Sequence, residues 1–510
     1  MNESNQRIAK NTFMLYMRMF FTMGISLYTS RIILATLGVT DYGIYNVVGG
    51  VVSMLSIINN SMAASTQRFL SFELGAGNII KLTKIFSTSL NVHAVICLII
   101  ILLSETLGLW FINNKLQIPP ERIYSANWIY QMSIISLCVN IMSVPYNAAI
   151  IAHEKMSAFA YISILEVTLK LGIVYLLTIS PIDKLICYSI LMLIVVVIIR
   201  VIYSIYCKRH FEETIYHKVF DKTLFREMIS FAGWGLFGNC SAVASTQGVN
   251  LLLGTFFSPS INAARGIAVQ VQMAIQGLCT NFQIAVNPQI VQSFAKNELN
   301  RMKGLLYSSS KYSFFLLFLV ALPMILEANE ILSVWLKSVP EHTVNFLRII
   351  LCIALVDSLA NPIITAAGAT GKIKKYQIVV GSINLMILPI SYIALMIAPI
   401  PELVFVVHLI IAIMAQGMRL FLIKPLIDFS IYKYFTEVIL KVIQVIIVSS
   451  VIPVILYVHL PQFSICSFLI IGFTSVFSVM ICVYYLGMQR YERQILMTRI
   501  RSFVSQRQKK

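Results

Sequence analysis

Long apolar stretches, separated by short polar segments, fill most of the 510-residue chain. A helix needs about 20 apolar residues to cross a bilayer. The bilayer core offers backbone groups no partner outside the chain, so such stretches should be helices. The pattern predicts fourteen spans, at about residues 12–37, 42–65, 86–113, 124–152, 157–179, 184–206, 229–257, 262–287, 309–336, 344–370, 376–398, 402–424, 435–459 and 463–486.

The first span and the segment after it stand out. Leu37-Gly38 and Asp41-Tyr42-Gly43 predict a chain reversal into the second span. Arg18 and Arg31 lie inside the first span, where a charge costs at least ~2.5 kcal/mol. This helix is therefore expected to face something wet and anionic. The alternative for Arg31 is an ion pair with Asp41 that fixes the hairpin.

The loop charges orient the spans. If both termini are cytoplasmic, the cytoplasmic loops and tails hold 28 of the 39 lysines and arginines, and the opposite loops hold four. Basic residues concentrate on the cytoplasmic side of membrane proteins. Fourteen spans with both termini inside satisfy that rule.

Composition agrees with a multi-pass membrane protein. The chain is 58% hydrophobic and 12% charged, with a mean hydropathy of +0.82. Its basic loops account for the net charge of +18, so no nucleic-acid partner is indicated. The nine cysteines form no Cys-x-x-Cys motif, and no nucleophile, phosphate-loop or metal-binding motif occurs. We therefore expect no catalytic residues, no metal and no cofactor.

An internal repeat relates the two halves. Residues 67–72 resemble residues 289–294 at an offset of 222, Pro145 matches Pro362 at 217, and Arg200 matches Arg419 at 219. Each repeat holds six spans, an even number, so the two copies share one orientation. The predicted division is an N-terminal lobe (1–207), a cytoplasmic linker (208–228), a C-terminal lobe (229–430), two extra spans (431–486) and a basic cytoplasmic tail (487–510).

Polar residues form a stripe along the eighth span. Steps of three, four or seven place them on one helical face: Asn262, Arg265, Gln272, Gln276, Thr280, Gln283 and Asn287. Asn60 belongs to a fainter stripe on the second span. Lipid satisfies no such groups, so this face should line a hydrated cavity. A polar seam between packed helices is the alternative.

Few acidic residues lie within the predicted spans. Glu166 and Lys170 are four residues apart on one helical face, which predicts an ion pair. Asp357 is the other deep acid. These three residues are the candidates for coupling to protons or sodium ions, or for structural pairing.

Two motifs carry a family resemblance: RIILATLGVTDYGIYNVVGG at residues 31–50 and STQRFLSFELG at residues 65–75. With the fourteen-span plan, they resemble the Wzx-type polysaccharide-export flippases. These belong to the superfamily that also includes multidrug and toxin extrusion transporters and lipid II flippases.

The resemblance implies an all-α protein with two parallel six-helix lobes around a central cavity and two extra C-terminal helices. It implies flipping of an undecaprenyl-pyrophosphate-linked oligosaccharide to the periplasmic leaflet of the bacterial inner membrane, for O-antigen, capsule or exopolysaccharide. Arg18, Arg31 and Arg265 lie on the helices that hold cavity arginines in related flippases. A polysaccharide polymerase or ligase and membrane lipids would be partners.

Two other functions stay open. A cation-coupled drug exporter of the same fold would want an intramembrane carboxylate, and the first span has none. A non-transporting scaffold for glycan assembly would not need striped polar helices.

Overall fold

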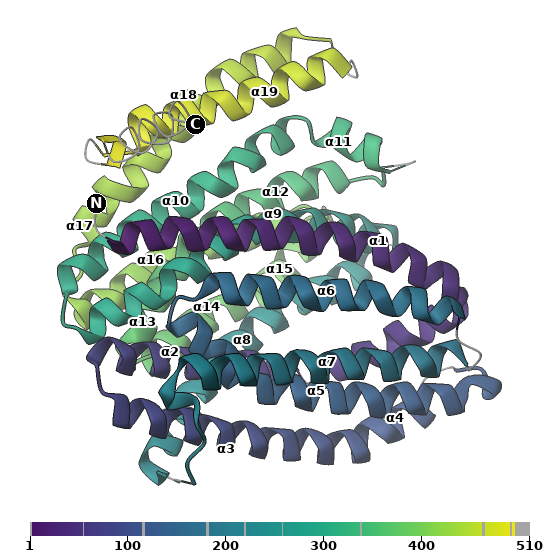
Figure 1. The fold of residues 1–510 in the computed structure, drawn as a ribbon. Helices are drawn as coiled ribbons and strands as arrows, with labels where there is room; N and C mark the ends of the chain where they lie inside the picture. Colours follow the sequence, from purple (N-terminus) through teal and green to yellow (C-terminus); the bar gives the residue numbers. More distant parts are fainter. Residues whose placement is uncertain are drawn as a thin grey trace, which may run out of the picture. The chain divides into compact units, whose positions relative to one another are not determined.

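The computed structural model describes residues 3–54, 56–114, 118–179, 183–218, 221–257, 259–336, 339–461, 465–489 and 492–494. Every regular element in these ranges is helical, as Figure 1 shows. This confirms the all-α prediction. The helical class follows from the bilayer, because a helix satisfies the hydrogen bonds of its own backbone there.

Contacts divide the chain into two compact units. The N-terminal unit comprises Arg7–Cys240 and Val291–Asn297; the C-terminal unit comprises Ser241–Ile290 and Glu298–Lys510, together with Met1–Gln6. Each unit is considered by itself below.

In the N-terminal unit, α5 lies at the centre and packs against α2, α3, α6 and α7. The helices of this half are α1 (Glu3–Met54), α2 (Ser56–Ala76), α3 (Ile79–Leu103), the π-helix η1 (Ser104–Gly108), α4 (Leu109–Asn114), the 3-10 helix η2 (Pro120–Arg122), α5 (Ile123–Ala152), α6 (Met156–Ile179), α7 (Lys184–His210), the 3-10 helix η3 (Glu212–Thr214) and the first part of α8 (Lys222–Phe256).

In the C-terminal unit, α10 and α16 both pack against α12, and α18 packs against α19. The remaining helices are α9 (Pro259–Ala295), α10 (Leu299–Leu326), α11 (Ala328–Trp335), α12 (Thr343–Ser358), α13 (Ala360–Ala369), α14 (Lys374–Leu385), α15 (Ile387–Ile397), α16 (Leu403–Ile427), α17 (Ile431–Tyr434), the π-helix η4 (Phe435–Ile439), α18 (Leu440–His459), α19 (Ile465–Cys482) and the π-helix η5 (Val483–Gly487).

Ten helical segments of the described chain are long and apolar enough to cross a membrane. They coincide with predicted spans 3 to 6 and 9 to 14. The other four predicted spans fall on α1, α2, α8 and α9, which are helical as well. The count of fourteen therefore stays a prediction.

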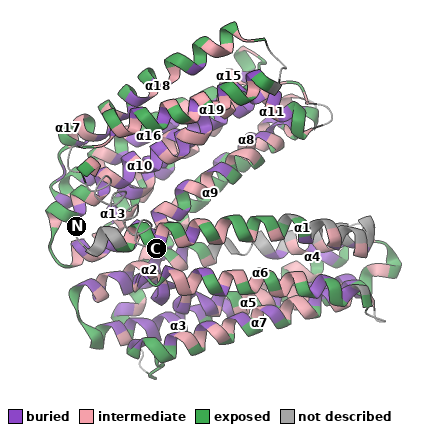
Figure 2. Ribbon diagram, turned by 45° about the horizontal axis from the view of Figure 1, so that its top comes forward, coloured by how far each residue is buried: buried purple, intermediate pink, exposed green. Residues whose placement is uncertain are grey.

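The outward faces of these helices are apolar. Figure 2 shows exposed residues along one side of α18, where Ile447, Val451 and Ile455 are 62%, 49% and 51% exposed. Rows of large, exposed aliphatic side chains along a helix match a lipid environment.

The predicted turn at Leu37 to Gly43 is wrong in its local geometry. Helical hydrogen bonding continues through it in α1 as far as Met54, inside the predicted second span. No proline lies between residues 12 and 65, so nothing removes a backbone donor there. Figure 1 shows the α1 ribbon curving round instead of stopping at a turn.

Close packing holds the end of α2. A Cβ atom on Gly75 would lie 2.8 Å from Cα of Gln292. The Gln292 side-chain amide donates to the Ala152 carbonyl at 2.7 Å. Nearby, the rings of Phe72 and Phe294, which the repeat offset of 222 pairs, are 6.3 Å apart.

Gly75→Ala should destabilise the protein by roughly 1–3 kcal/mol, because the added methyl group displaces backbone rather than a side chain. Gly304→Ala is the matched control: its Cβ meets nothing within 4 Å, and a helical alanine gains about 0.5–1 kcal/mol over glycine. Thermal unfolding in detergent measures both. Equal melting temperatures for the two variants would contradict the packing argument.

Candidate functional site: polar and charged side chains of the helix interiors

The ten candidate site residues are divided between the units. Arg18, Arg31, Asn60, Glu166 and Lys170 belong to the N-terminal unit. Arg265, Gln272, Gln276, Gln283 and Asp357 belong to the C-terminal unit.

Arg18 faces the interior of its own unit. Its guanidinium lies over the ring of Phe159 on α6, 4.7 Å from the centroid. It also interacts electrostatically with Tyr203 and Glu166. A cation over an aromatic ring is stabilised without a carboxylate contact. Asn60 is exposed on α2.

The side chain of Arg31 lies outside the described residues. Asp41, its alternative partner, is bound by Arg122: Nη2 of Arg122 lies 2.9 Å from Oδ2 of Asp41. Arg122 comes from the segment before α5, and Asp41 is buried. The ion pair ties α1 to the start of α5.

Arg265 is the buried arginine of α9, only 9% exposed. Its Nη2 donates to the Thr246 carbonyl on α8 at 2.9 Å, and its Nε has no hydrogen-bond partner. No ion pair joins Arg265 to a carboxylate within the described residues. His408 on α16 is close enough to interact with it electrostatically.

Gln272 and Gln276 are half-buried on α9, and their side-chain amides bond to each other. Thr280, one turn further, is exposed and donates to the Gln276 carbonyl at 3.0 Å. This part of the stripe satisfies its hydrogen bonds within α9.

Gln283 is buried where α12 gives way to α13. Its amide donates to Oγ of Ser313 at 3.0 Å and to the carbonyl of Ser358 at 3.2 Å. The side-chain amide of Asn361 donates to its oxygen at 2.7 Å. The Ser358 carbonyl is four residues before Pro362, which has no N–H to offer it. Gln283 therefore supplies the donor that the proline lacks.

A similar contact closes the break between α14 and α15. The Ser245 hydroxyl on α8 donates to the Asn384 carbonyl at 2.7 Å. A Cβ atom on Gly248 would lie within 2.2 Å of the Leu388 side chain, so α8 approaches this break closely. Pro389, three residues after Met386, gives the physical reason for the interruption.

The acidic candidates are engaged with cations. Nζ of Lys170 lies 2.5 Å from Oε1 of Glu166, so the predicted pair forms. Asp357 interacts electrostatically with Arg419. Arg419 is buried, and its Nη1 donates to the side chain of Gln416 at 3.4 Å. In the described chain, no cluster of three or more His, Cys, Asp or Glu side chains could hold a metal ion.

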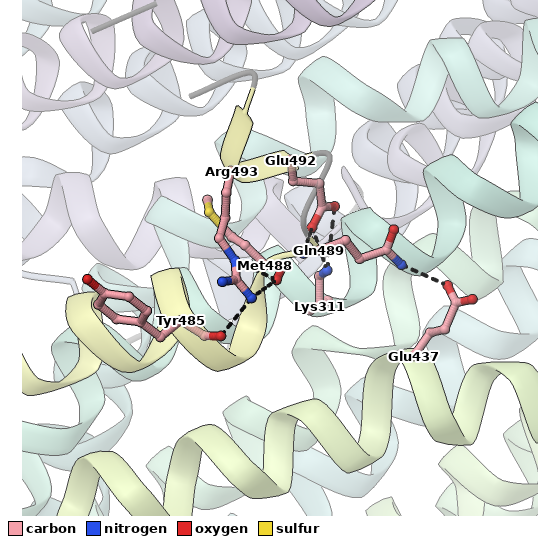
Figure 3. Close-up of polar contacts among 7 residues, drawn as sticks. All are labelled: Lys311, Glu437, Tyr485, Met488, Gln489, Glu492 and Arg493. Carbon is pink, nitrogen blue, oxygen red and sulfur yellow. Dashed lines mark hydrogen bonds and ion pairs between the residues drawn. The ribbon is translucent and has the colours of Figure 1, made fainter. Parts of the chain in front are cut away.

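The sequence analysis missed a buried ion pair between α10 and the C-terminal segment. Nζ of Lys311 lies 3.0 Å from Oε2 of Glu492, and the lysine side chain is 3% exposed. Figure 3 shows Glu492 reaching Lys311 from the segment after η5. Lys311 lies at the beginning of the predicted span 309–336, and only a contact across 181 residues shows its partner.

The same segment closes the end of the last span. Nη2 of Arg493 donates to the carbonyls of Tyr485 at 2.8 Å and Met488 at 3.1 Å (Figure 3). The Gln489 side chain donates to Glu437 of η4 at 3.3 Å. A Cβ atom on Gly487 would lie 2.7 Å from the Phe315 ring, so η5 is pressed against α10.

Comparison with known proteins gives a family and a fold. The family model described as "Polysaccharide biosynthesis protein" matches residues 8–294. A search of curated proteins found no match.

The solved structures that the fold resembles are transporters. An outward-facing multidrug resistance MATE family transporter of the MOP superfamily is 11% identical, with a TM-score of 0.72 over 84% of this chain and 98% of that one. A MATE transporter in the straight conformation is 11% identical at a TM-score of 0.71, over 84% and 97%. The MATE transporter ClbM, in complex with Rb⁺, is 12% identical at 0.66, over 84% and 96%.

Gln283→Leu should destabilise the C-terminal unit by about 1–3 kcal/mol, because it leaves the Ser358 carbonyl buried without a donor. Pro362→Ala restores a backbone N–H at that position. The double variant should therefore be more stable than the two separate losses predict. Thr280→Val, on the exposed part of α9, is the control. Strict additivity in a thermal double-mutant cycle would count against this role.

Glu492→Gln should cost roughly 3 kcal/mol, because it leaves the Lys311 ammonium buried without a carboxylate. Adding Lys311→Met should recover most of the loss. Glu298→Gln is the control: its pair with Arg301 is exposed, and such pairs are worth less than about 1 kcal/mol. Chemical denaturation of the purified protein measures all of them. If the Glu492 and Glu298 variants lose equal stability, the ion pair is not the anchor.

Proposed function

Because the chain belongs to the polysaccharide biosynthesis protein family, we propose that it flips an oligosaccharide linked to undecaprenyl pyrophosphate across the bacterial inner membrane. The cargo moves from the cytoplasmic to the periplasmic leaflet by alternating access and supplies surface polysaccharide such as O-antigen, capsule or exopolysaccharide. The observation that carries the proposal is the family match, which covers residues 8–294.

The charge distribution supports an anionic cargo. Arg265 is buried on α9 with an unused Nε donor, and the described carboxylates Glu166 and Asp357 both face cations. A guanidinium binds phosphate oxygens through two parallel hydrogen bonds, which a lysine does not reproduce. Arg265 is therefore the proposed pyrophosphate contact, with Arg18, Arg31, Asn60, Gln272 and Gln276 as the further cavity residues of the hypothesis. Gln283, the other predicted cavity residue, is buried in helix packing and is left out of it.

A cation-coupled multidrug exporter is the second candidate. It is favoured by the likeness of the fold to multidrug resistance transporters. Such an exporter needs an accessible carboxylate to attract cationic drugs. A proton or sodium gradient would act, in the flippase or in the exporter, through two sites: Glu166 with Lys170, and Asp357 near Arg419.

The proposal includes a place in the cell. Both termini face the cytoplasm, and a membrane-embedded polysaccharide polymerase or ligase consumes the flipped product. No cofactor is assigned.

Deletion of the gene should abolish surface polysaccharide and leave the lipid-linked repeat unit in the cytoplasmic leaflet, with drug sensitivity unchanged.

Arg265→Lys should impair export and Arg265→Ala should abolish it at normal protein levels, because only arginine offers the bidentate geometry. Arg301→Ala, on the exposed face of α10, is the control and should export normally.

The outcomes separate the candidates. Lost drug resistance with a normal surface glycan would identify the exporter. Loss of glycan on deletion, together with full export by Arg265→Ala, would keep the flippase and reject Arg265 as the anion contact.

A further inference from the structure

A charged clamp joins three elements at one end of the N-terminal unit. Nη1 of Arg122, at the start of α5, lies 2.5 Å from Oδ2 of Asp183, the residue before α7. The Ser125 hydroxyl donates to the same carboxylate oxygen at 3.4 Å. Asp183 also accepts from the backbone N–H groups of Leu185 and Ile186, at 3.0 and 3.2 Å, and so caps α7. The second arm of Arg122 holds Asp41, as described above.

The C-terminal unit has a clamp of the same construction. Nδ1 of His342, the residue before α12, lies 2.6 Å from Oε1 of Glu402, the residue before α16. The Asn345 side chain donates to the same oxygen at 3.1 Å. Oε2 of Glu402 is buried without a hydrogen-bond partner.

The internal repeat pairs the two clamps residue by residue. Arg122 corresponds to His342 and Ser125 to Asn345, both at an offset of 220, and Asp183 corresponds to Glu402 at 219. These offsets lie within the 217 to 222 of the repeat. Each clamp therefore has a cation, a neutral donor three residues later, and an acid at or just before the start of the next predicted span but one: spans 4 and 6 in the first clamp, spans 10 and 12 in the second.

The side-chain lengths of the cation and the acid balance each other in both clamps. The long arginine meets the short aspartate, and the shorter histidine meets the longer glutamate. The third arm is missing from the second clamp, because the position 220 residues after Asp41 is Ile261. The decisive difference is the cation: arginine stays charged at every physiological pH, whereas an ordinary imidazole titrates between about pH 5 and 8.

The surroundings of His342 add two more observations. Its φ of +66° is uncommon for a residue with a side chain, and such a conformation persists where the surroundings hold it. Its ring stacks on Phe346 at 5.9 Å. Both argue that the imidazole is fixed in place.

Other charged groups lie in the loop of His342, on α12 and on α11, which packs against α12. Nε2 of His342 lies 3.8 Å from Glu341 of the same loop. Arg348, further along α12, donates to the Ile325 and Leu326 carbonyls at the end of α10. At the junction with α11, Glu327 bonds to Glu330. Of the two carboxylates next to the ring, Glu402 makes the shorter contact, at 2.6 Å.

We propose that His342 and Glu402 form a proton-binding site that makes the tie between α12 and α16 depend on pH, while the Arg122 clamp stays constant. The loop charges predict that this end faces the periplasm, where the pH varies with the surroundings. The site is independent of the cargo.

The direction follows from the chemistry. With a proton on the imidazole, the pair is a charged hydrogen bond between imidazolium and carboxylate; with the proton lost, a weaker neutral-to-charged bond remains. Burial raises the pKa of Glu402, but hydrogen bonds from His342 and Asn345 outweigh it and hold the pKa below its ordinary value. The stabilisation from Glu402 is therefore present above the ordinary carboxyl range and lost as the pH falls through the lowered pKa. The tie is strongest where the imidazole carries its proton and the carboxyl group does not, and it weakens once the imidazole proton is lost.

The experiment exchanges the clamps. Hydrogen exchange of the full chain in lipid nanodiscs reports protection factors for the first turns of α12 and α16 at about pH 6 and about pH 8.5. In the wild type, protection should fall about fivefold between the two, the difference between a charged and a neutral hydrogen bond. His342→Arg with Glu402→Asp should remove the dependence and keep protection high. His342→Asn, which tolerates the positive φ, should remove it and keep protection low.

The reverse exchange is the second arm. Arg122→His with Asp183→Glu should confer pH dependence on the first turns of α5 and α7, which are insensitive in the wild type. If protection at α12 and α16 has the same pH profile in the wild type and in the arginine–aspartate variant, His342 is not the proton-binding group and the proposal is overturned.

Discussion

A carbonyl that leaves its helical hydrogen bond inside a membrane needs a donor from the protein, since lipid has none. The structure meets this demand repeatedly with side chains from neighbouring helices. Gln283 serves the Ser358 carbonyl, and Ser245 serves that of Asn384. These two interruptions are therefore also points of tertiary contact: α9 meets the break between α12 and α13, and α8 meets the break between α14 and α15.

The same demand explains why polar residues of one helix differ in their surroundings. On α9, the side-chain amide of Gln283 is hydrogen-bonded to neighbouring helices, and those of Gln272 and Gln276 bond to each other. Arg265 has an Nε donor without a hydrogen-bond partner. A polar stripe on a membrane helix is thus a mixture. Part of it serves the fold, and only the remainder is free to meet a cargo.

The sequence was sufficient for the helical class, because the length and apolarity of segments such as α7 and α16 depend on the bilayer alone. The internal repeat was also readable, and it later identified the corresponding clamp residues. The first hairpin was misread, because glycines at 38 and 43 permit a turn without requiring one. The partners of Gln283 and Lys311 were out of reach, since each contact depends on which helices become neighbours. Pro362 was a usable signal: a proline in a span announces a carbonyl in need of a donor.

The two residues of the Lys311–Glu492 pair are synthesised at different times, and this limits when the pair can form. The ribosome adds about 5–20 residues per second, so α10 enters the membrane some ten seconds or more before Glu492 has been made 181 residues later. During that interval a lysine destined for burial has no carboxylate. Lys311 can therefore be buried with its partner only after the segment that follows η5 has been made.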